Sequence, residues 1–175
     1  MKVTTINSEV LFTNSDITEV SAEDLEFLKE KSINNERKRI RLCVHKDIDD
    51  KVHEMIIVHG KGAYVRPHKH LARSESLHVI EGEAYAIIFD DSGHISQVIH
   101  MGDKNSGSPF YYRISCAVYH SLVIVSDFFI FHEAVEGPFD KSKSAFAPFS
   151  PADGDKKNIE EFSKKLKRQL NSREG

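Results

Sequence analysis

The feature that most constrains the fold is a series of short segments rich in Val, Ile, Tyr and Phe between residues 38 and 136. Gly, Asp and Ser separate these segments, and no stretch between them has the spacing of an amphipathic helix. Short strands at regular spacing are typical of a β-sandwich or β-barrel, whereas an α/β sheet needs intervening helices. The sequence therefore predicts a mainly all-β domain, with strands near residues 39–45, 53–59, 63–70, 76–81, 83–90, 95–101, 110–114, 118–126 and 128–135.

A helix is expected near each end of the chain. After a short extended segment around Leu11, Ser21 is suited to the N-cap position, because Glu23 and Asp24 then fall in the first turn, where carboxylates are favourable. Residues 156–175 are highly charged but carry one apolar stripe at spacings of three and four, formed by Ile159, Phe162, Leu166 and Leu170. This spacing predicts a C-terminal helix that is either docked by its stripe or frayed.

The length and charge of the chain exclude several classes of protein. Its 175 residues suit one domain, and 24 basic against 27 acidic side chains give a net charge of −3, which argues against nucleic-acid binding. No apolar run approaches the ~18 residues of a membrane span, and the N terminus lacks the apolar core of a signal peptide. The two cysteines fit no disulfide framework or CxxC site. We expect a cytoplasmic protein with an N-terminal extension (1–36), a β-barrel (37–151) and a charged C-terminal helix or tail (152–175).

The densest group of chemically active side chains lies between Gly62 and Gly82. His68 and His70 are two residues apart, so on a strand both imidazoles leave the same face. Glu75 follows a short turn and would return beside them from the adjoining strand. Imidazole and carboxylate ligands suit iron, manganese, nickel, copper or zinc, so these side chains predict a site for one divalent transition metal ion. The alternative is a group of buried histidines without metal, which would leave Glu75 buried with no charge partner.

A fourth ligand would have to come from a distant part of the chain. His120 is the best candidate, because it lies in a second apolar, strand-like segment. The order of the whole pattern is Gly62, five residues, His68-x-His70, four residues, Glu75, six residues and Gly82.

This pattern resembles the first motif of the cupin superfamily position by position. The second cupin motif is kept only in part. His120 stands where the family has its last histidine ligand, but Ser115 and Ala117 replace the usual Pro and Gly, and Ile124 replaces the usual Asn. The resemblance implies a double-stranded β-helix, or jelly-roll barrel, whose single metal ion is bound by His68, His70, Glu75 and His120.

Further stretches are similar to the WbuC-type cupins, small proteins encoded among bacterial O-antigen and capsule biosynthesis genes. The similarity covers about residues 36–151 and is carried by Tyr64-Val-Arg-Pro-His, Phe89-Asp-Asp-Ser-Gly, Tyr111-Tyr-Arg-Ile, Gly137-Pro-Phe-Asp and Phe146-Ala-Pro-Phe-Ser-Pro. The reaction of that family is not established. The resemblance therefore implies a setting, surface polysaccharide biosynthesis, more than a mechanism.

Arg66 and Tyr64 are candidates for binding a substrate. Both share strand parity with His68, which would place their side chains inside the barrel near the metal. An inward-facing guanidinium in an apolar barrel needs a negative partner. For Arg66 this partner would be either an anionic group of the ligand or an internal carboxylate.

Weaker candidates come from three other segments. Tyr112 and Arg113 stand just before the segment of His120, and strand alternation places them on opposite faces, so only one of them would line the mouth. His45 would point inward from an early strand. Glu133, on the last apolar segment, is a candidate hydrogen-bond partner of a ligand or a general base.

The stretch from Lys29 to Lys46 is strongly basic. In one interpretation it is a solvated helix end followed by an exposed strand edge. In the other, Arg37, Arg39 and Arg41 face an anion together, because alternate residues of a strand share a face.

Different classes of function remain open at this point. The first is an enzyme acting on a small carbohydrate-derived or hydroxy/keto compound, of isomerase or epimerase type or an iron-dependent oxygenase. The second is a non-catalytic, metal-dependent module that binds a sugar or sugar nucleotide, and a third is a structural metal in an interaction domain. A homodimer is expected, because a small β-barrel leaves exposed edge strands.

Overall fold

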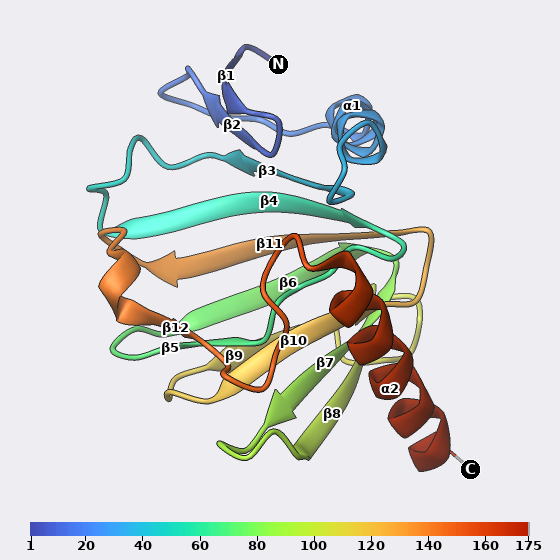
Figure 1. Ribbon diagram of the computed structural model, residues 1–175. Helices are drawn as coiled ribbons and strands as arrows, with labels where there is room; N and C mark the ends of the chain where they lie inside the picture. Colours follow the sequence, from blue (N-terminus) through green and yellow to red (C-terminus); the bar gives the residue numbers. More distant parts are fainter. Residues whose placement is uncertain (175) are drawn as a thin grey trace.

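The computed structural model describes residues 1–174, which form two facing β-sheets with a helix near each end of the chain (Figure 1). The seven-stranded sheet contains, in spatial order, β1 (Val3–Asn7), β2 (Val10–Thr13), β3 (Arg39–Cys43), β4 (Val52–Gly60), β11 (Phe128–Glu136), β6 (Glu75–Glu81) and β9 (Tyr111–Ile114). The five-stranded sheet contains β12 (Ser144–Phe146), β5 (His68–His70), β10 (Tyr119–Ile124), β7 (Glu83–Phe89) and β8 (Ile95–Gly102).

All neighbouring strands are antiparallel except β2 and β3, which are parallel. The predicted all-β jelly-roll barrel with terminal helices is confirmed. The strand predicted over 63–70 is the largest error, because only His68–His70 is paired. Gly62 has a positive φ of 85°, and Pro67 has no N–H to donate, so residues 61–67 form a turn and irregular chain. Neither β1 nor β12 was predicted.

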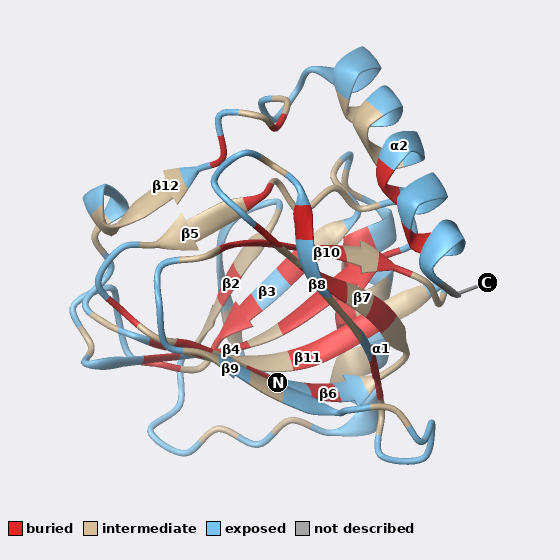
Figure 2. Ribbon diagram, turned by 90° about the horizontal axis from the view of Figure 1, so that it is seen from below, coloured by how far each residue is buried: buried red, intermediate tan, exposed pale blue. Residues whose placement is uncertain are grey.

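The core lies between the sheets and is formed by alternate residues of the strands (Figure 2). On β6, Leu77 and Val79 point inward on the same face as Glu75. From β11, the rings of Phe129 and Phe131 fill the space between the sheets. The strand that buries this apolar core therefore also directs a carboxylate into the barrel.

Each helix covers the outer face of one sheet. The first, α1 (Ala22–Ile33), has Ser21 as its N-cap residue, as predicted, with a capping box in which Ser21 and Asp24 bond to each other's main chain. Its Leu28 packs on the seven-stranded sheet. The second, α2 (Lys156–Glu174), packs Leu166 and Leu170 against the five-stranded sheet. Neither of these helices has both the length and the hydropathy needed to cross a membrane.

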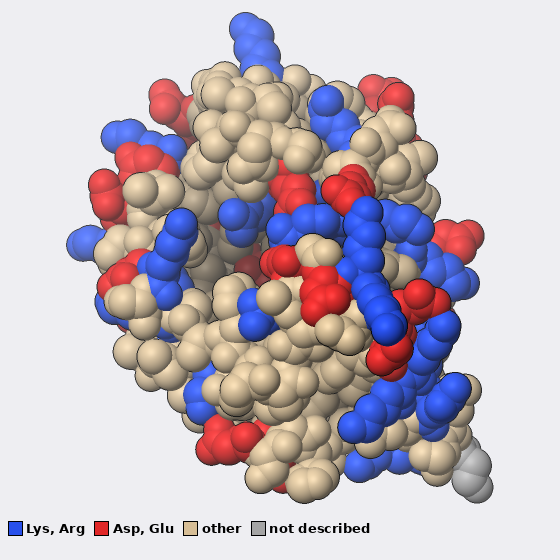
Figure 3. All heavy atoms as spheres, viewed as in Figure 1, with Lys and Arg blue, Asp and Glu red and all other residues tan. Residues whose placement is uncertain are grey.

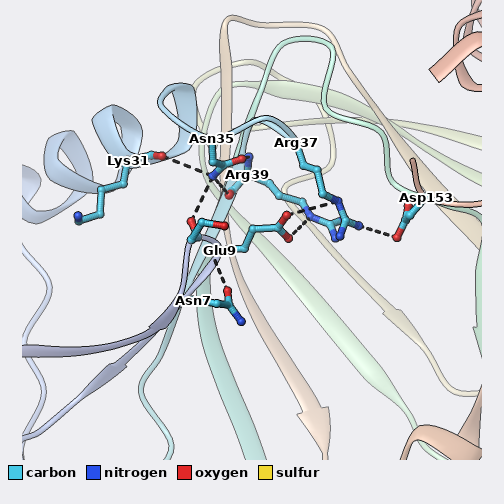
Figure 4. Close-up of polar contacts among 8 residues, drawn as sticks. Asn7, Glu9, Lys31, Asn35, Arg37, Arg39 and Asp153 are labelled. Atoms are coloured by element: carbon cyan, nitrogen blue, oxygen red, sulfur yellow. Dashed lines mark hydrogen bonds and ion pairs between the residues drawn. The ribbon is translucent and has the colours of Figure 1, made fainter. Parts of the chain in front are cut away.

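The three arginines of the basic stretch do not act together. Glu9, in the turn between β1 and β2, forms ion pairs with Arg37 at 3.4 Å and with Arg39 at 2.8 Å (Figure 4). Arg37 also forms an ion pair with Asp153 at 2.6 Å. The expected joint anion-facing cluster is therefore not formed by all three arginines. Two are neutralised by the chain itself, and only Arg41 has no ion pair among the described residues.

Candidate metal centre

The four predicted ligands meet between the two sheets. His68 and His70 lie on β5, His120 lies opposite His68 on β10, and Glu75 is the first residue of β6 in the facing sheet. One ligand atom from each residue lies within 4.8 Å of all the others. His120 joins the group because β5 and β10 are neighbours, although they are far apart in the sequence.

Each imidazole is held through its outer nitrogen, Nδ1. The Nδ1 atoms of His68 and His120 each donate to the main-chain oxygen of the residue two positions earlier, at 2.9 and 3.0 Å. The Nδ1 of His70 lies 3.0 Å from the hydroxyl of Ser144, which faces it across the β5–β12 pair. A carbonyl acceptor requires the proton on Nδ1, which leaves the Nε2 lone pair free, as in metal-bound histidines.

Burial and the charge of Glu75 set the protonation of the group. Burial alone would raise the pKa of Glu75, but the imidazoles of His120 and His70 outweigh burial and hold that pKa well below its usual range. Burial also disfavours a charged His120, but Glu75 outweighs it and raises the pKa of that ring. Burial lowers the pKa of His68 to about 4, so this imidazole is neutral near pH 7. An ionised carboxylate therefore stands beside a neutral imidazole, as metal ligands must.

One atom of the group lacks a partner. The Nε2 of His120 is buried and has no hydrogen-bond partner within residues 1–174. It lies 3.0 Å from Glu75 Oε1 but outside hydrogen-bond geometry, whereas His70 Nε2 is hydrogen-bonded to Glu75 Oε2 at 2.9 Å. An unsatisfied buried nitrogen costs about 1–3 kcal/mol. A divalent metal ion would satisfy this atom, so three imidazoles and one carboxylate fit iron, manganese, nickel or zinc better than they fit a metal-free cluster.

The ligands are accessible from one side. A cavity of about 530 Å³ is lined by His68, His70 and Ser144 together with residues of β2, β3, β4 and β11. A second cavity of about 530 Å³ also contacts His68 and Ser144 and extends to Arg66. Figure 3 shows this face hollowed, with Lys and Arg side chains at the rim. These volumes are typical of sites for small molecules.

Arg66 and Tyr64, the two candidates in the irregular segment before β5, occupy different positions in the structure. Arg66 lines the second cavity, where its Nε lies 3.3 Å from the Ser150 hydroxyl and its guanidinium lies 4.3 Å from the ring centre of Phe146. Tyr64 instead donates to the main-chain oxygen of Pro151 at 3.0 Å and contacts α2, so its expected position near the metal is wrong. Strand parity fails at Tyr64 because the chain there is not a strand.

Tyr112 and Arg113 point to opposite faces of β9, as predicted. Tyr112 packs at the edge of the core, where burial and then the charge of Glu75 raise its pKa well above the usual 10. Arg113 is exposed and donates to the Ser74 hydroxyl at 2.8 Å. Neither side chain belongs to the walls of the two cavities.

His45 and Glu133 both line the first cavity. His45 is buried, with its Nδ1 3.0 Å from the main-chain oxygen of Glu54 and its ring stacked on His53 at 4.1 Å. Glu133 lies on β11 opposite Leu77 of β6. Burial, and then the charge of Glu75, raise the pKa of Glu133 to about 8.

Sequence reasoning missed Arg73 and Ser144. Arg73 is only 9% exposed, and its Nη2 donates to the hydroxyl of Ser144 at 3.0 Å and to the main-chain oxygen of Asp140 at 3.2 Å. The position of Arg73 two residues before Glu75 was a usable signal. Ser144 had none, because the pairing of β12 with β5 cannot be seen locally.

The fold and this group of side chains define a double-stranded β-helix protein with a candidate metal centre. A family model described as a domain of unknown function (DUF6016) matches residues 20–101. The matched region contains His68, His70 and Glu75 and ends before His120. Among curated proteins, none matches the chain.

Several solved structures are similar to this chain. A protein from Shewanella oneidensis is 10% identical with a TM-score of 0.47 (59% of this chain, 66% of that one). The cupin domain of Cnp3 from Schizosaccharomyces pombe is 10% identical with a TM-score of 0.45 (57% and 64%). An uncharacterized protein with a double-stranded β-helix domain from Klebsiella pneumoniae is 19% identical with a TM-score of 0.48 (62% and 79%). The chain thus spans less than two thirds of the first two structures.

Proposed function

We propose that this protein is a mononuclear metal enzyme that acts on a small carbohydrate-derived or hydroxy/keto compound, of isomerase or epimerase type or an iron-dependent oxygenase. The observation that carries the proposal is the convergence of three imidazoles and a carboxylate beside a cavity that opens to small molecules. Structural metal sites are usually closed, whereas a site reached from a cavity leaves coordination positions for a substrate.

His68, His70, Glu75 and His120 would hold the ion. When bound, a divalent transition metal polarises substrate oxygens as a Lewis acid, and iron(II) adds oxygen chemistry. The Nδ1 contacts of the three histidines fix the rings in place beforehand, so the ligands need little rearrangement.

Other side chains of the cavity would handle the substrate. Glu133 lines the same cavity as His68 and His70, which supports a role for its carboxyl in exchanging a proton with a substrate carbon beside a carbonyl. Arg66 would orient an anionic group, and His45 would form part of the wall. Tyr112 would keep its hydroxyl proton near Glu75 and act by positioning, since it does not line the cavity.

The biological setting is part of the same proposal. The resemblance to WbuC-type cupins supports a role in surface polysaccharide biosynthesis in the cytoplasm, with a sugar or sugar nucleotide as ligand. A homodimer is supported by the free edges of β1 and β9, which end the seven-stranded sheet. Light scattering coupled to size-exclusion chromatography tests the dimer.

The decisive experiment starts from protein purified without an affinity tag. Elemental analysis should find about one transition metal ion per chain, and the loaded protein is then incubated with nucleotide sugars and hydroxy or keto acids, with and without oxygen. NMR and mass spectrometry should detect turnover that is lost in Glu75→Gln. In Glu133→Gln the rate should fall by about 100-fold or more while the metal content is unchanged.

Two outcomes contradict the proposal. Tight binding without turnover would favour the binding or regulatory module. Absence of any bound ion after loading with manganese, iron, nickel and zinc would remove the basis for both functions.

A further inference from the structure

The cavities beside the metal centre are lined by cations that the chain does not neutralise. Arg73 lines the first cavity, Arg66 lines the second, and Arg41 and Lys141 line both. Within residues 1–174, no carboxylate lies within ion-pair distance of any of these four side chains. This arrangement contrasts with Arg39, which belongs to the same wall and is held by Glu9 (Figure 4).

Arg73 gives the strongest indication, because it is buried. Its guanidinium donates to the Ser144 hydroxyl and to the main-chain oxygen of Asp140 and lies 5.8 Å from the ring centre of Phe139, but it forms no ion pair with a carboxylate among residues 1–174. Its Nε is buried and lacks a hydrogen-bond partner in the described part of the chain. A buried charge without a counterion is strongly unfavourable, so an anion from outside would stabilise this arrangement.

The buried arginine is linked to the metal centre through one hydroxyl. Ser144 Oγ lies 3.0 Å from Arg73 Nη2 and 3.0 Å from His70 Nδ1. An anion bound at Arg73 would therefore lie beside the metal centre rather than on it. The same cavity extends over Arg41 on β3, whose side chain is exposed and unpaired. A single small ligand can thus reach both the metal ligands and the cations.

Glu133 does not neutralise the cations that line the first cavity. It is the only acidic side chain in the wall of the first cavity, against Arg41, Arg73 and Lys141, and it forms no ion pair with any of them. The second cavity contains Asp153, which is already paired with Arg37. The walls of both cavities thus keep an excess of positive charge that favours a negatively charged ligand.

We propose that the substrate carries, apart from the oxygens that would face the metal, a separate carboxylate or phosphate group that binds to Arg73 and Arg41. This inference rests on the proposed function for the metal-facing part of the ligand. It narrows the substrate class to small compounds that carry metal-facing oxygens at one end and a separate anionic group at the other.

The test compares three small ligands that share the same metal-chelating group, a 2-hydroxy carboxylate. Glycerate offers a 2-hydroxy carboxylate, 3-phosphoglycerate adds a phosphate to it, and malate offers the same end with a second carboxylate. Calorimetric titration of the Mn²⁺-loaded full chain should give at least tenfold tighter binding for 3-phosphoglycerate or malate than for glycerate. Which of the two binds tighter identifies the anionic group as phosphate or carboxylate.

Variants assign the preference to residues. Arg41→Gln and Arg73→Gln should each weaken the preferred probe about tenfold and leave glycerate unchanged. Arg41 touches no metal ligand, so its variant remains informative if Arg73→Gln disturbs His70 through Ser144. Arg168→Gln, on the exposed side of α2, removes the same charge elsewhere and should change nothing. The Mn²⁺ content of each variant is checked by electron paramagnetic resonance.

The results of these titrations distinguish a failure of the anion site from a failure of the proposed metal-dependent function. Equal affinities for the three probes in the wild type, or a preference that survives both arginine substitutions, would overturn the anion site and leave the metal centre standing. If no metal binds, the metal-free protein is titrated with inorganic phosphate in a thermal-shift assay. Stabilisation of the wild type but not of the two variants would then support the anion site by itself, and its absence would overturn it.

Discussion

At the scale of single residues, the candidate centre depends on how each ligand is held. His68 and His120 are fixed by main-chain oxygens, so no side-chain substitution removes those contacts. His70 depends on one hydroxyl, that of Ser144. Glu75 is the only negative ligand and contacts two of the imidazoles. The four positions should therefore differ in their sensitivity to mutation.

Glu75→Gln should weaken metal binding by at least about 100-fold, because it removes the single negative ligand from a buried site. Calorimetric titration with Mn²⁺ or Zn²⁺ measures the effect. His78→Gln is the matched control, since this exposed side chain lies on the opposite face of β6 and its variant should bind metal normally. Equal affinities in the two variants would show that Glu75 is not a ligand.

Ser144→Ala should weaken metal binding about tenfold, because it frees the ring of His70 without removing a ligand. The same titration measures it, and Ser144→Thr, which restores a hydroxyl, should recover most of the loss. Ser142→Ala, in the short exposed 3-10 helix Lys141–Lys143, serves as the control. Unchanged affinity in Ser144→Ala would mean that the contact does not orient the ring.

His59 should make stability depend on pH independently of the metal. This buried histidine on β4 packs against Phe131, and burial lowers its pKa to about 4. The unfolded chain binds a proton at a pKa of about 6.5, so stability falls as the pH drops from about 6.5 towards 4, by about 2 kcal/mol at pH 5. In His59→Gln the loss should be smaller than in the wild type by about this amount, because the contribution of His68, whose pKa burial also lowers to about 4, then remains. Urea unfolding of both metal-free proteins at about pH 7 and pH 5 compares them, and parallel losses would contradict the prediction.

At the scale of elements, alternation and spacing predicted most of the structure. The nine expected strands and both helices exist, because apolar periodicity and the Ser21 cap are local signals. The strand over 63–70 was overextended past Pro67, and β12 was missed, because its three residues pair only with the distant β5. The prediction thus failed for short strands that pair only with distant parts of the chain, because their local sequence pattern is weak.

The docking of α2 is the element-scale interaction that is easiest to test. Leu170 is 3% exposed against the five-stranded sheet, so Leu170→Ala should lower the free energy of unfolding by about 2–3 kcal/mol. Arg168→Ala, two residues away on the exposed side, should change it by less than about 0.5 kcal/mol. Urea denaturation followed by circular dichroism measures both. Similar small effects would mean that the helix is frayed in solution.

At the scale of the whole molecule, the fold and the metal centre are separable. The main core joins both sheets through apolar residues and contains none of the four ligands. Metal ligands in a preformed barrel add stability by binding rather than by creating the fold. This separation distinguishes the molecule from small domains that are unfolded without their metal.

Chelation should therefore lower the melting temperature without unfolding the protein at room temperature. Removing an ion present at 100 times its Kd costs about 2.7 kcal/mol of stability. Thermal melts with and without EDTA, together with far-ultraviolet circular dichroism at 25 °C, measure this. Loss of the β-sheet spectrum on chelation would instead indicate a structural metal.

The sequence by itself predicted the class of fold and all four candidate ligands. Side-chain direction along a strand follows from the backbone, so His68 and His70 had to leave the same face of β5. The position of Glu75 on the facing sheet and the pairing of β5 with β10, which brings in His120, are tertiary. Only the tertiary structure decided which cations stay free around the ligands. Glu9 neutralises Arg37 and Arg39 but not Arg41, and β12 brings Ser144 between Arg73 and His70. These contacts join segments that are distant in the chain, and no local pattern encodes such pairings.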